Sequence, residues 1–351
     1  MATESGKGEL AVPLGNALNS IQCIRDQVRD GESGEQGGAY DLSVFWDTLN
    51  QAVTVVSMAA TLLSMGSSKN PQPSLQVLQD GEKLLVTVLN STLTLSEVYS
   101  CLPESQGVTL RRQVRDATVE VLDGILQLVE VIISSPLQSL TQEQITFTRG
   151  VWSACDRFAQ LARDNKEALL VDVSSQSGVV KDVVEKIKQL LSEPQDPFKD
   201  CLIHDPEDNS DRDSPHSIRD VSLSEKDQQV IRASLEVLET AASCLRKFRS
   251  AVEDNGDAAE PQNVAQLDDL ADISREISPS VDDLALCLYP PMNYSGVENH
   301  MSRLAATLRK LLDLIRSSHV CGAAELTWIQ FLEAAVDHNV QKAKESIELD
   351  G

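Results

Sequence analysis

The stretch from Thr109 to Ile133 constrains the fold more than any other part of the sequence. Its apolar residues recur at alternating steps of four and three, which is the heptad spacing of a helix that packs along one seam. The residues on this seam are Leu110, Val114, Ala117, Val121, Gly124, Leu128 and Val131. A shorter run with the same spacing lies nearer the C-terminus, at Met301, Leu304, Leu308, Leu311 and Ile315. Both runs predict long helices that pack side by side.

Helical periodicity covers most of the chain, and only 4% of its residues are aromatic, a composition that favours packed helices over sheets. Between Glu193 and Asp227, prolines and acidic residues interrupt the periodicity, as is typical of a linker. The sequence therefore predicts an all-α protein with two antiparallel helical bundles joined by an acidic, partly disordered linker. The predicted parts are a flexible N-terminal segment that could hold one helix (1–38), an N-terminal bundle (39–193), the linker (194–223) and a C-terminal bundle (224–351).

The charge of the chain limits which classes of partner it can bind. The formal net charge is −24, and a chain this acidic repels nucleic acid and anionic lipid. The run that looks most apolar, Val119–Ile133, is interrupted by acidic residues, so no membrane span is expected. The first ten residues lack the pattern of a signal peptide, and the seven cysteines stand singly, as in a reducing compartment. We expect cytoplasmic and nuclear residence.

The motifs that carry catalysis are missing from the sequence. It contains no nucleophile elbow, no phosphate-binding glycine loop and no zinc-protease helix motif. Cys201 and His204 have the spacing of two zinc ligands, but no second ligand pair accompanies them. The sequence predicts a protein that is not an enzyme and that holds no cofactor or metal.

The segment Val264–Met292 reads as two short amphipathic helices hinged at Ser278-Pro279, with Ser278 or Ser280 as the cap of the second. Its carboxylates would form an acidic ridge made of Asp269, Asp272, Glu276 and Asp283. One interpretation is a docking surface for a basic partner. The other is an ordinary solvated helix face, and composition alone favours this second interpretation.

Three further patterns are candidate sites. Arg111, Arg112 and Arg115 lie at a predicted helix start, where the helix dipole disfavours cations, so they predict either a bound carboxylate or phosphate or an internal salt bridge. Ser210 and Ser214 are candidate phosphorylation sites in the linker. The Arg-x-Leu docking pattern at 309–312 includes a residue of the second heptad run, so we expect it to be buried.

Three strings carry a resemblance to a known family. They are Gln106–Val131, Arg163–Leu170 and, most closely, Val264–Met292. In this order they resemble the cyclin-D-interacting protein family, also called the Maid or Id-like helix-loop-helix family. A weaker likeness runs from about residue 45 to 191 and from about 225 to 344.

The resemblance implies a non-enzymatic regulator that binds D-type cyclins, with helix-loop-helix transcription factors as a second class of partner, and that negatively regulates cell-cycle progression. The matching helix-loop-helix unit would be residues 75–102, 103–107 and 109–133. No basic run precedes it, so direct DNA contact is not expected. A partner would also compete with the bundle for the seam of 109–133. The alternative function is a helical-bundle cytoskeletal or scaffold adaptor of the vinculin and talin kind.

Overall fold

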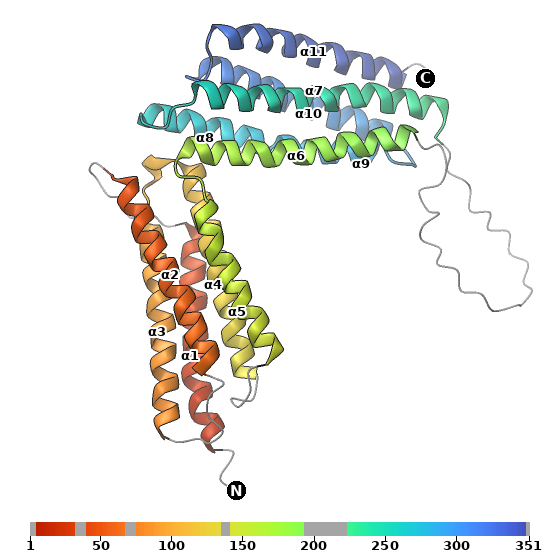
Figure 1. Cartoon of the computed structure of the whole chain (residues 1–351). Coiled ribbons are helices and arrows are strands. Elements are labelled where there is room, and N and C mark those ends of the chain that lie inside the picture. Colours follow the sequence, from red (N-terminus) through yellow and green to blue (C-terminus); the bar gives the residue numbers. More distant parts are fainter. Residues whose placement is uncertain (1–4, 32–39, 67–74, 135–140, 193–222, 349–351) are drawn as a thin grey trace, which may run out of the picture. The chain divides into compact units, whose positions relative to one another are not determined.

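The computed structural model describes residues 5–31, 40–66, 75–134, 141–192 and 223–348. Every regular element within these ranges is a helix, which confirms the predicted all-α class (Figure 1). The chain divides into two compact units, Met1–Ala168 and Leu169–Gly351, and each is described by itself. The predicted linker lies outside the described residues except for its last residue, Leu223.

The first unit is a bundle of long helices that run up and down in turn (Figure 1). Helix α3 packs mainly against α1 and α2, whereas α4 packs mainly against α1 and α5. Two short 3-10 helices, at Glu104–Gln106 and Phe158–Gln160, lie in the connections. The long helices are α1 (Ser5–Asp30), α2 (Leu42–Gly66), α3 (Leu75–Ser100), α4 (Val108–Ser134) and α5 (Gln142–Arg157).

The N-terminal segment contains the one helix that the sequence allowed for it. Helix α1 occupies most of it, and Ile21 and Val28 on its inner face are almost fully buried in the core of the first unit. Burying apolar side chains of this size offsets the entropy of ordering the helix. The segment is therefore part of the bundle and not an appendage to it.

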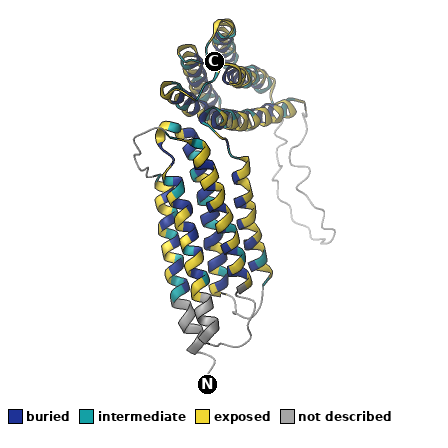
Figure 2. Cartoon of the chain, turned by 60° about the vertical axis from the view of Figure 1, so that its left-hand side comes forward, coloured by how far each residue is buried: buried dark blue, intermediate teal, exposed yellow. Residues whose placement is uncertain are grey.

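Helix α4 is buried on a wider face than its heptad seam. Leu110, Val114, Val121 and Leu128 of the seam are fully buried, but so are Ile125 and its neighbours on the adjoining face. The cause is that α4 contacts α1 on one side and α5 on another, which leaves buried side chains along much of the bundle (Figure 2). Four of the seven predicted seam residues are therefore core, whereas Ala117, Gly124 and Val131 are only partly buried.

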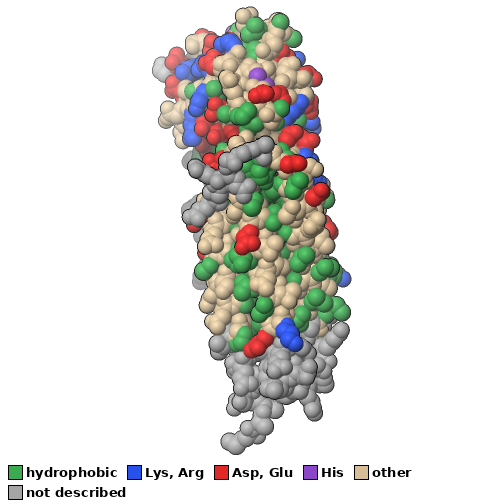
Figure 3. All heavy atoms as spheres, turned by 90° about the vertical axis from the view of Figure 1, so that its left-hand side faces the viewer, with side chains coloured by type: hydrophobic (Ala, Val, Ile, Leu, Met, Phe, Trp, Pro, Cys, Tyr) green, Lys and Arg blue, Asp and Glu red, His purple; other side chains and the backbone are tan. Residues whose placement is uncertain are grey.

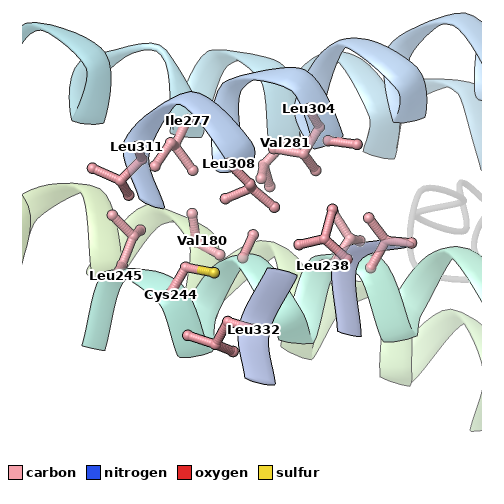
Figure 4. Close-up of a cluster of buried hydrophobic side chains, with 14 of the residues drawn as sticks. Val180, Leu238, Cys244, Leu245, Ile277, Val281, Leu304, Leu308, Leu311 and Leu332 are labelled. Atoms are coloured by element: carbon pink, nitrogen blue, oxygen red, sulfur yellow. The ribbon is translucent and has the colours of Figure 1, made fainter. Parts of the chain in front are cut away.

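The second unit contains the other six helices, and its core gathers around α10. Helix α7 packs mainly against α11, while α10 packs against α9 and α11. All five residues of the second heptad run are fully buried. Leu304, Leu308 and Leu311 from this run face Ile277 and Val281 of α9 in Figure 4. The helices are α6 (Asn165–Ser192), α7 (Glu225–Asn255), α8 (Pro261–Arg275), α9 (Ile277–Cys287), α10 (Tyr294–Ser317) and α11 (Ala323–Glu348).

The boundary between the units lies earlier than the predicted residue 193. Helix α6 begins in the first unit, but from Leu169 onward it belongs to the second. Val173, Val180 and Ile187 on α6 are fully buried in the core of the second unit. The prediction placed the boundary at the proline-rich stretch, whereas the apolar face of α6 decides which core it joins.

The break between α8 and α9 lies at Glu276, two residues before the predicted hinge. Pro279 is in the first turn of α9, where a missing backbone N–H costs nothing. The predicted serine caps are wrong, because Glu276 occupies the N-cap position and no side chain caps this end. The Ser278 hydroxyl donates instead to Gln176 Oε1 at 2.5 Å, and the Ser280 hydroxyl donates to the Glu276 carbonyl at 2.7 Å.

Helix α2 is the most apolar long helix among the described residues. Leu42–Met65 is long and apolar enough to cross a membrane by length and composition, with a mean hydropathy of 1.2 and 44% of that window buried. The prediction had treated Val119–Ile133 as the most apolar run and overlooked α2. A core helix of a helical bundle passes the same test, so composition alone decides nothing here.

Candidate functional site

The acidic ridge exists on the outer face of α8 and at its C-terminal end. Asp269, Asp272 and Glu276 are exposed, while Leu267, Leu270 and Ile273 on the inner face are buried. This separation follows from the helical repeat, which places residues three and four apart on one face. The prediction that these three carboxylates share an exposed face is therefore confirmed.

Arg275 holds the ridge against a second helix. Its guanidinium binds Asp272 Oδ1 at 2.7 Å on α8 and Asp172 Oδ2 at 2.6 Å on α6. Asp172 and Arg275 are each about four-fifths buried, with exposed fractions of 21% and 23%. A partly buried, two-pronged contact of this kind fixes the helix, and the shared guanidinium offsets part of the charge of Asp272. Most of the remaining negative charge of the ridge comes from Asp269 and Glu276.

Asp283 is compensated from a different helix. It lies on α9 and is half-buried, with Arg303 Nη1 at 3.6 Å and His300 Nδ1 at 3.8 Å, both on α10. The prediction grouped Asp283 with the ridge because the sequence does not show which helix it faces. Its charge is already opposed within the second unit, so it adds little to an anionic docking surface.

The arginine cluster is largely internal to the first unit. Arg111 is buried, with its guanidinium 4.8 Å from the centre of the Tyr99 ring. It donates to the Leu102 carbonyl and, at 3.0 Å, to the Gly31 carbonyl. Gly31 directly follows α1 and Leu102 follows α3, so Arg111 binds the backbone at the ends of two different helices. These partners of Arg111 are internal to the first unit, and the predicted choice between a bound anion and an internal salt bridge stays a prediction.

The other two arginines of the cluster are half-buried at the surface of α4. Arg115 pairs with its neighbour Asp116 at 2.8 Å, and Arg112 also has an interaction within the molecule. The three arginines therefore do not form one basic patch. Ser210 and Ser214, together with Cys201 and His204, lie outside the described residues.

The Arg-x-Leu pattern is closed to a partner. Leu311 and Leu312 are fully buried in the second unit, and Arg309 binds Asp337 Oδ1 at 2.6 Å. Exposing one buried leucine costs about 1.5–3 kcal/mol, and docking would need both. The prediction that Leu311 of this pattern is buried is confirmed.

A depression with a volume of about 490 Å³ lies between α4 and α5, and no motif in the sequence predicts it. Gly124 and Gly150 form part of its floor, and a Cβ atom added to Gly124 would meet Val151 Cγ2 at 3.2 Å. Gly124 lets the two helices approach closely, so a glycine in the middle of a helical run was the available signal.

The carboxylates that line this depression are paired with arginines. Arg157 binds Glu120, and Asp123 lies 3.1 Å from Arg25 and 3.8 Å from Arg29. Opposed charges at these distances leave no isolated acid or base for proton transfer. The depression is a surface feature between helices and offers no constellation that could carry out a reaction.

The described part of the chain shows little other chemistry. No three His, Cys, Asp or Glu side chains within it come together as ligands of a metal ion would. Burial raises the pKa of the Cys155 and Cys244 thiols to about 12, so both stay protonated at neutral pH and act as small apolar residues. What the structure offers is a set of exposed helix faces, and these suit binding.

Family models match both halves of the chain. Residues 48–193 match the model described as Grap2 and cyclin-D-interacting, N-terminal, and residues 205–313 match the corresponding C-terminal model. The chain belongs to the cyclin-D-interacting family. The N-terminal match covers the arginine cluster and α2 to α6 except for the first residues of α2, and the C-terminal match covers the acidic ridge and most of α10.

Similar members of this family extend over almost the whole chain. The Cyclin-D1-binding protein 1 homolog of Danio rerio is 49% identical over 350 residues, which is 100% of both chains. The Xenopus laevis homolog is 42% identical over 333 residues, 95% of this chain and 97% of the relative. Cyclin-D1-binding protein 1 of Homo sapiens is 37% identical over 339 residues, 95% of this chain and 92% of the relative.

Proposed function

We propose that this protein is a non-enzymatic interaction protein that binds a D-type cyclin. The observation that carries the proposal is the 37–49% identity, over nearly the full length of each, to relatives named for binding cyclin D1. The structure supports a binding role because its two cores are closed and its exposed faces are fixed by well-packed helices. Among the described residues, no three His, Cys, Asp or Glu side chains come together as metal ligands would.

The acidic ridge is our candidate for the cyclin contact. Asp269 and Glu276 project from a helix whose other face is fully packed, and Arg275 ties that helix to α6. A rigid anionic face favours a partner with a basic surface, since complementary potentials speed encounter and fix orientation. The overall charge of −24 would strengthen the attraction from a distance.

The test is a binding titration of the full chain against purified D-type cyclin. The triple variant Asp269→Lys, Asp272→Lys and Glu276→Lys should weaken binding at least about tenfold. A double variant, Asp269→Lys with Glu276→Lys, leaves the Asp272–Arg275 ion pair in place and should show most of the effect.

The matched control is Asp254→Lys with Glu298→Lys, which makes the same change in net charge at exposed positions on two other helices, α7 and α10. Binding that both double variants weaken equally would mean that bulk charge is responsible. Binding that no ridge variant changes would remove the ridge from the account and leave cyclin binding to another face.

Helix-loop-helix transcription factors remain a proposed second class of partner, but we propose that they do not pair with the α3–α4 unit. The seam of α4 is buried, and α3 packs mainly against α1 and α2, so the two helices do not form an isolated helix-loop-helix. Exposing Leu110, Val114, Val121 and Leu128 together would cost about 6–12 kcal/mol, comparable with the whole stability of a domain. Such a factor would have to meet an exposed face.

We further propose that cyclin binding lets the protein restrain cell-cycle progression, and that it resides in both cytoplasm and nucleus. Depleting the protein should shorten the time to S-phase entry, and restoring the triple ridge variant should not reverse this, whereas restoring the Asp254 and Glu298 control should. Imaging of the tagged full chain should show signal in both compartments. An unchanged cell-cycle profile after depletion would contradict the proposed role.

A further inference from the structure

Helix α2 carries a second apolar stripe that faces outward. Val55, Met58, Leu62 and Met65 have exposed fractions of 46%, 55%, 50% and 47%, whereas large apolar residues in a bundle are normally hidden. Their spacing is three, four and three, the heptad spacing of a helix that receives another helix. Gln51, Thr48 and Val44 continue the same spacing toward the N-terminal end of α2, and all three are exposed.

The outward stripe is separate from the face with which α2 joins its own bundle. Leu49, Val56 and Ala60 on the inner face are fully buried, and Leu63 is almost so. Helix α2 is therefore apolar on two faces, while one face is enough to hold it in the first unit. This explains why its mean hydropathy reaches that of a membrane span although the inner face is core. An outward seam of this kind needs its own explanation.

The surroundings of the stripe are almost free of charge. Asp47 is the only ionisable residue in α2, and the stretch of α3 from Leu84 to Ser96 has none. On α3, the neighbour of α2, Val86 and Leu93 are exposed by 55% and 42%. Figure 3 shows hydrophobic and uncharged polar side chains over much of this side of the first unit, with few charges among them. For a chain with a net charge of −24, such a neutral face is exceptional.

We propose that the outward stripe of α2 is a self-association surface, and that its occupant is α2 of a second copy of this chain. A two-fold contact places the same patch on both subunits, so a seam that carries no charge is complementary to itself without further features. A foreign partner would be selected mainly by charge, and this face offers none. Two acidic chains also repel each other least where their surfaces are neutral.

An antiparallel arrangement fits the four apolar residues best. With the two-fold axis passing between Met58 and Leu62, Val55 lies opposite the partner's Met65, and Met58 lies opposite the partner's Leu62. Every apolar residue of the stripe then meets an apolar residue, and the polar Gln51 falls at the edge. The stripe from Val55 to Met65 spans about 15 Å of helix, which is short for a permanent dimer. The contact should therefore be weak and depend on concentration.

The proposal is tested by sedimentation of the full chain over a wide range of concentrations. We expect a monomer–dimer equilibrium, and Leu62→Glu should raise the dimer dissociation constant at least about tenfold, because it places two carboxylates in the seam. The matched control is Leu286→Glu, the same substitution at a leucine that is 73% exposed on α9. It should leave the equilibrium unchanged. Circular dichroism verifies that both variants keep their helix content.

A charge-pair experiment tests the register independently. Met58→Lys and Leu62→Glu chains should each dimerise poorly alone, but an equimolar mixture should associate again, because the new lysine faces the partner's new glutamate. A chain that stays monomeric at every concentration would overturn the proposal. A dimer that Leu62→Glu leaves intact would also overturn it. So would a mixture of the Met58→Lys and Leu62→Glu chains that associates no better than either chain alone. A chain that stays monomeric could instead float with phosphatidylcholine vesicles. If Leu62→Glu abolishes that flotation, the stripe is a membrane-binding surface and the proposal is wrong.

Discussion

The second unit and helix α2 of the first unit differ in how their outer faces meet solvent. In the second unit, ion pairs cross between neighbouring helices over much of the surface. In the first unit, α2 presents a single ionisable residue and an exposed apolar stripe. The pairs of the second unit join Lys188 to Glu239, Arg275 to Asp172, Arg303 to Asp283, Arg309 to Asp337, Arg316 to Glu333 and Lys342 to Glu236.

The contrast shows that helices with similar buried faces can have outer faces that suit different partners. A helix whose outer face carries paired charges is stable in a monomer, since water solvates that face. A helix whose outer face is apolar and neutral has surface left to bury. The surface chemistry of α2 and that of α8 therefore suggest different partners, a second copy for the first and a basic protein for the second.

The largest expected effect compares a buried seam with the exposed one. Leu308→Ala in α10 should lower the free energy of unfolding by about 2–5 kcal/mol, because the residue is fully buried and its removal leaves a cavity. Leu62→Ala should change it by less than about 0.5 kcal/mol in dilute, monomeric protein. Denaturant unfolding of the full chain measures both. Equal losses would mean that the α2 stripe is packed in the monomer.

The buried arginine should matter for the stability of the first unit. Arg111→Ala should cost about 2–3 kcal/mol, since two carbonyls lose a charged donor and Tyr99 loses its cation contact. Arg111→Lys should recover only part of this, because one ammonium group cannot reproduce the planar two-pronged contact. A variant that unfolds normally but no longer binds cyclin would show instead that Arg111 is a partner contact.

A smaller effect is expected in the pH dependence of the second unit. Burial lowers the pKa of His319 below 6.5, and its Nε2 accepts the Asp257 backbone N–H at 3.1 Å, so the folded state favours the neutral ring. The unfolded chain is protonated first as the pH falls, so the stability contributed by this group is present above pH 6.5 and is lost as the pH falls from 6.5 through the lower folded pKa.

The measurement for this prediction is unfolding between neutral and mildly acidic pH. Relative to His319→Gln, the original chain should lose up to about 1 kcal/mol more over this range, since one hydrogen bond to a half-exposed ring is at stake. The Gln side chain can still meet the Asp257 N–H but does not titrate. Parallel pH profiles for the two proteins would contradict the assignment of a neutral ring.

The smallest effect should come from the surface ion pairs themselves. Arg309→Ala removes the ion pair with Asp337, in which the Arg309 side chain is 44% exposed and the Asp337 side chain 66%. The free energy of unfolding should fall by less than about 1 kcal/mol. The loss should shrink further in high salt, because screening weakens exposed pairs. A large, salt-independent loss would show that the charged surface of the second unit holds it together, and would weaken the contrast drawn above.

Much of the fold could be predicted from the sequence because apolar spacing records which side of a helix is buried. The α10 run is core as predicted, and so are Leu110, Val114, Val121 and Leu128 of the α4 seam. The unit boundary could not be predicted, since the side chains of α6 fit either bundle by pattern alone and only packing assigns them to the second. Likewise, the N-terminal segment reads as weakly amphipathic, and its burial depends on the space that α3 and α4 leave for α1.

Only some features of the candidate surfaces could be predicted from the sequence. The exposure of Asp269, Asp272 and Glu276 follows from helical periodicity, but the clamp of Arg275 on Asp172 joins residues 103 positions apart. The arginine cluster looked like one patch because its members are adjacent in sequence, although Arg111 points inward. The α2 stripe was missed because an apolar run does not reveal whether its second face has a neighbour.

Hydrogen exchange along the full chain, measured with and without purified D-type cyclin, tests the central claim most directly. The claim is that both cores stay closed in the free protein and that partners meet its exterior. We predict slow exchange in α4 and α10 in both states, with added protection confined to exposed segments such as the end of α8. Loss of protection in α3 and α4 on cyclin binding would show that the bundle opens to donate its seam, and would contradict the account.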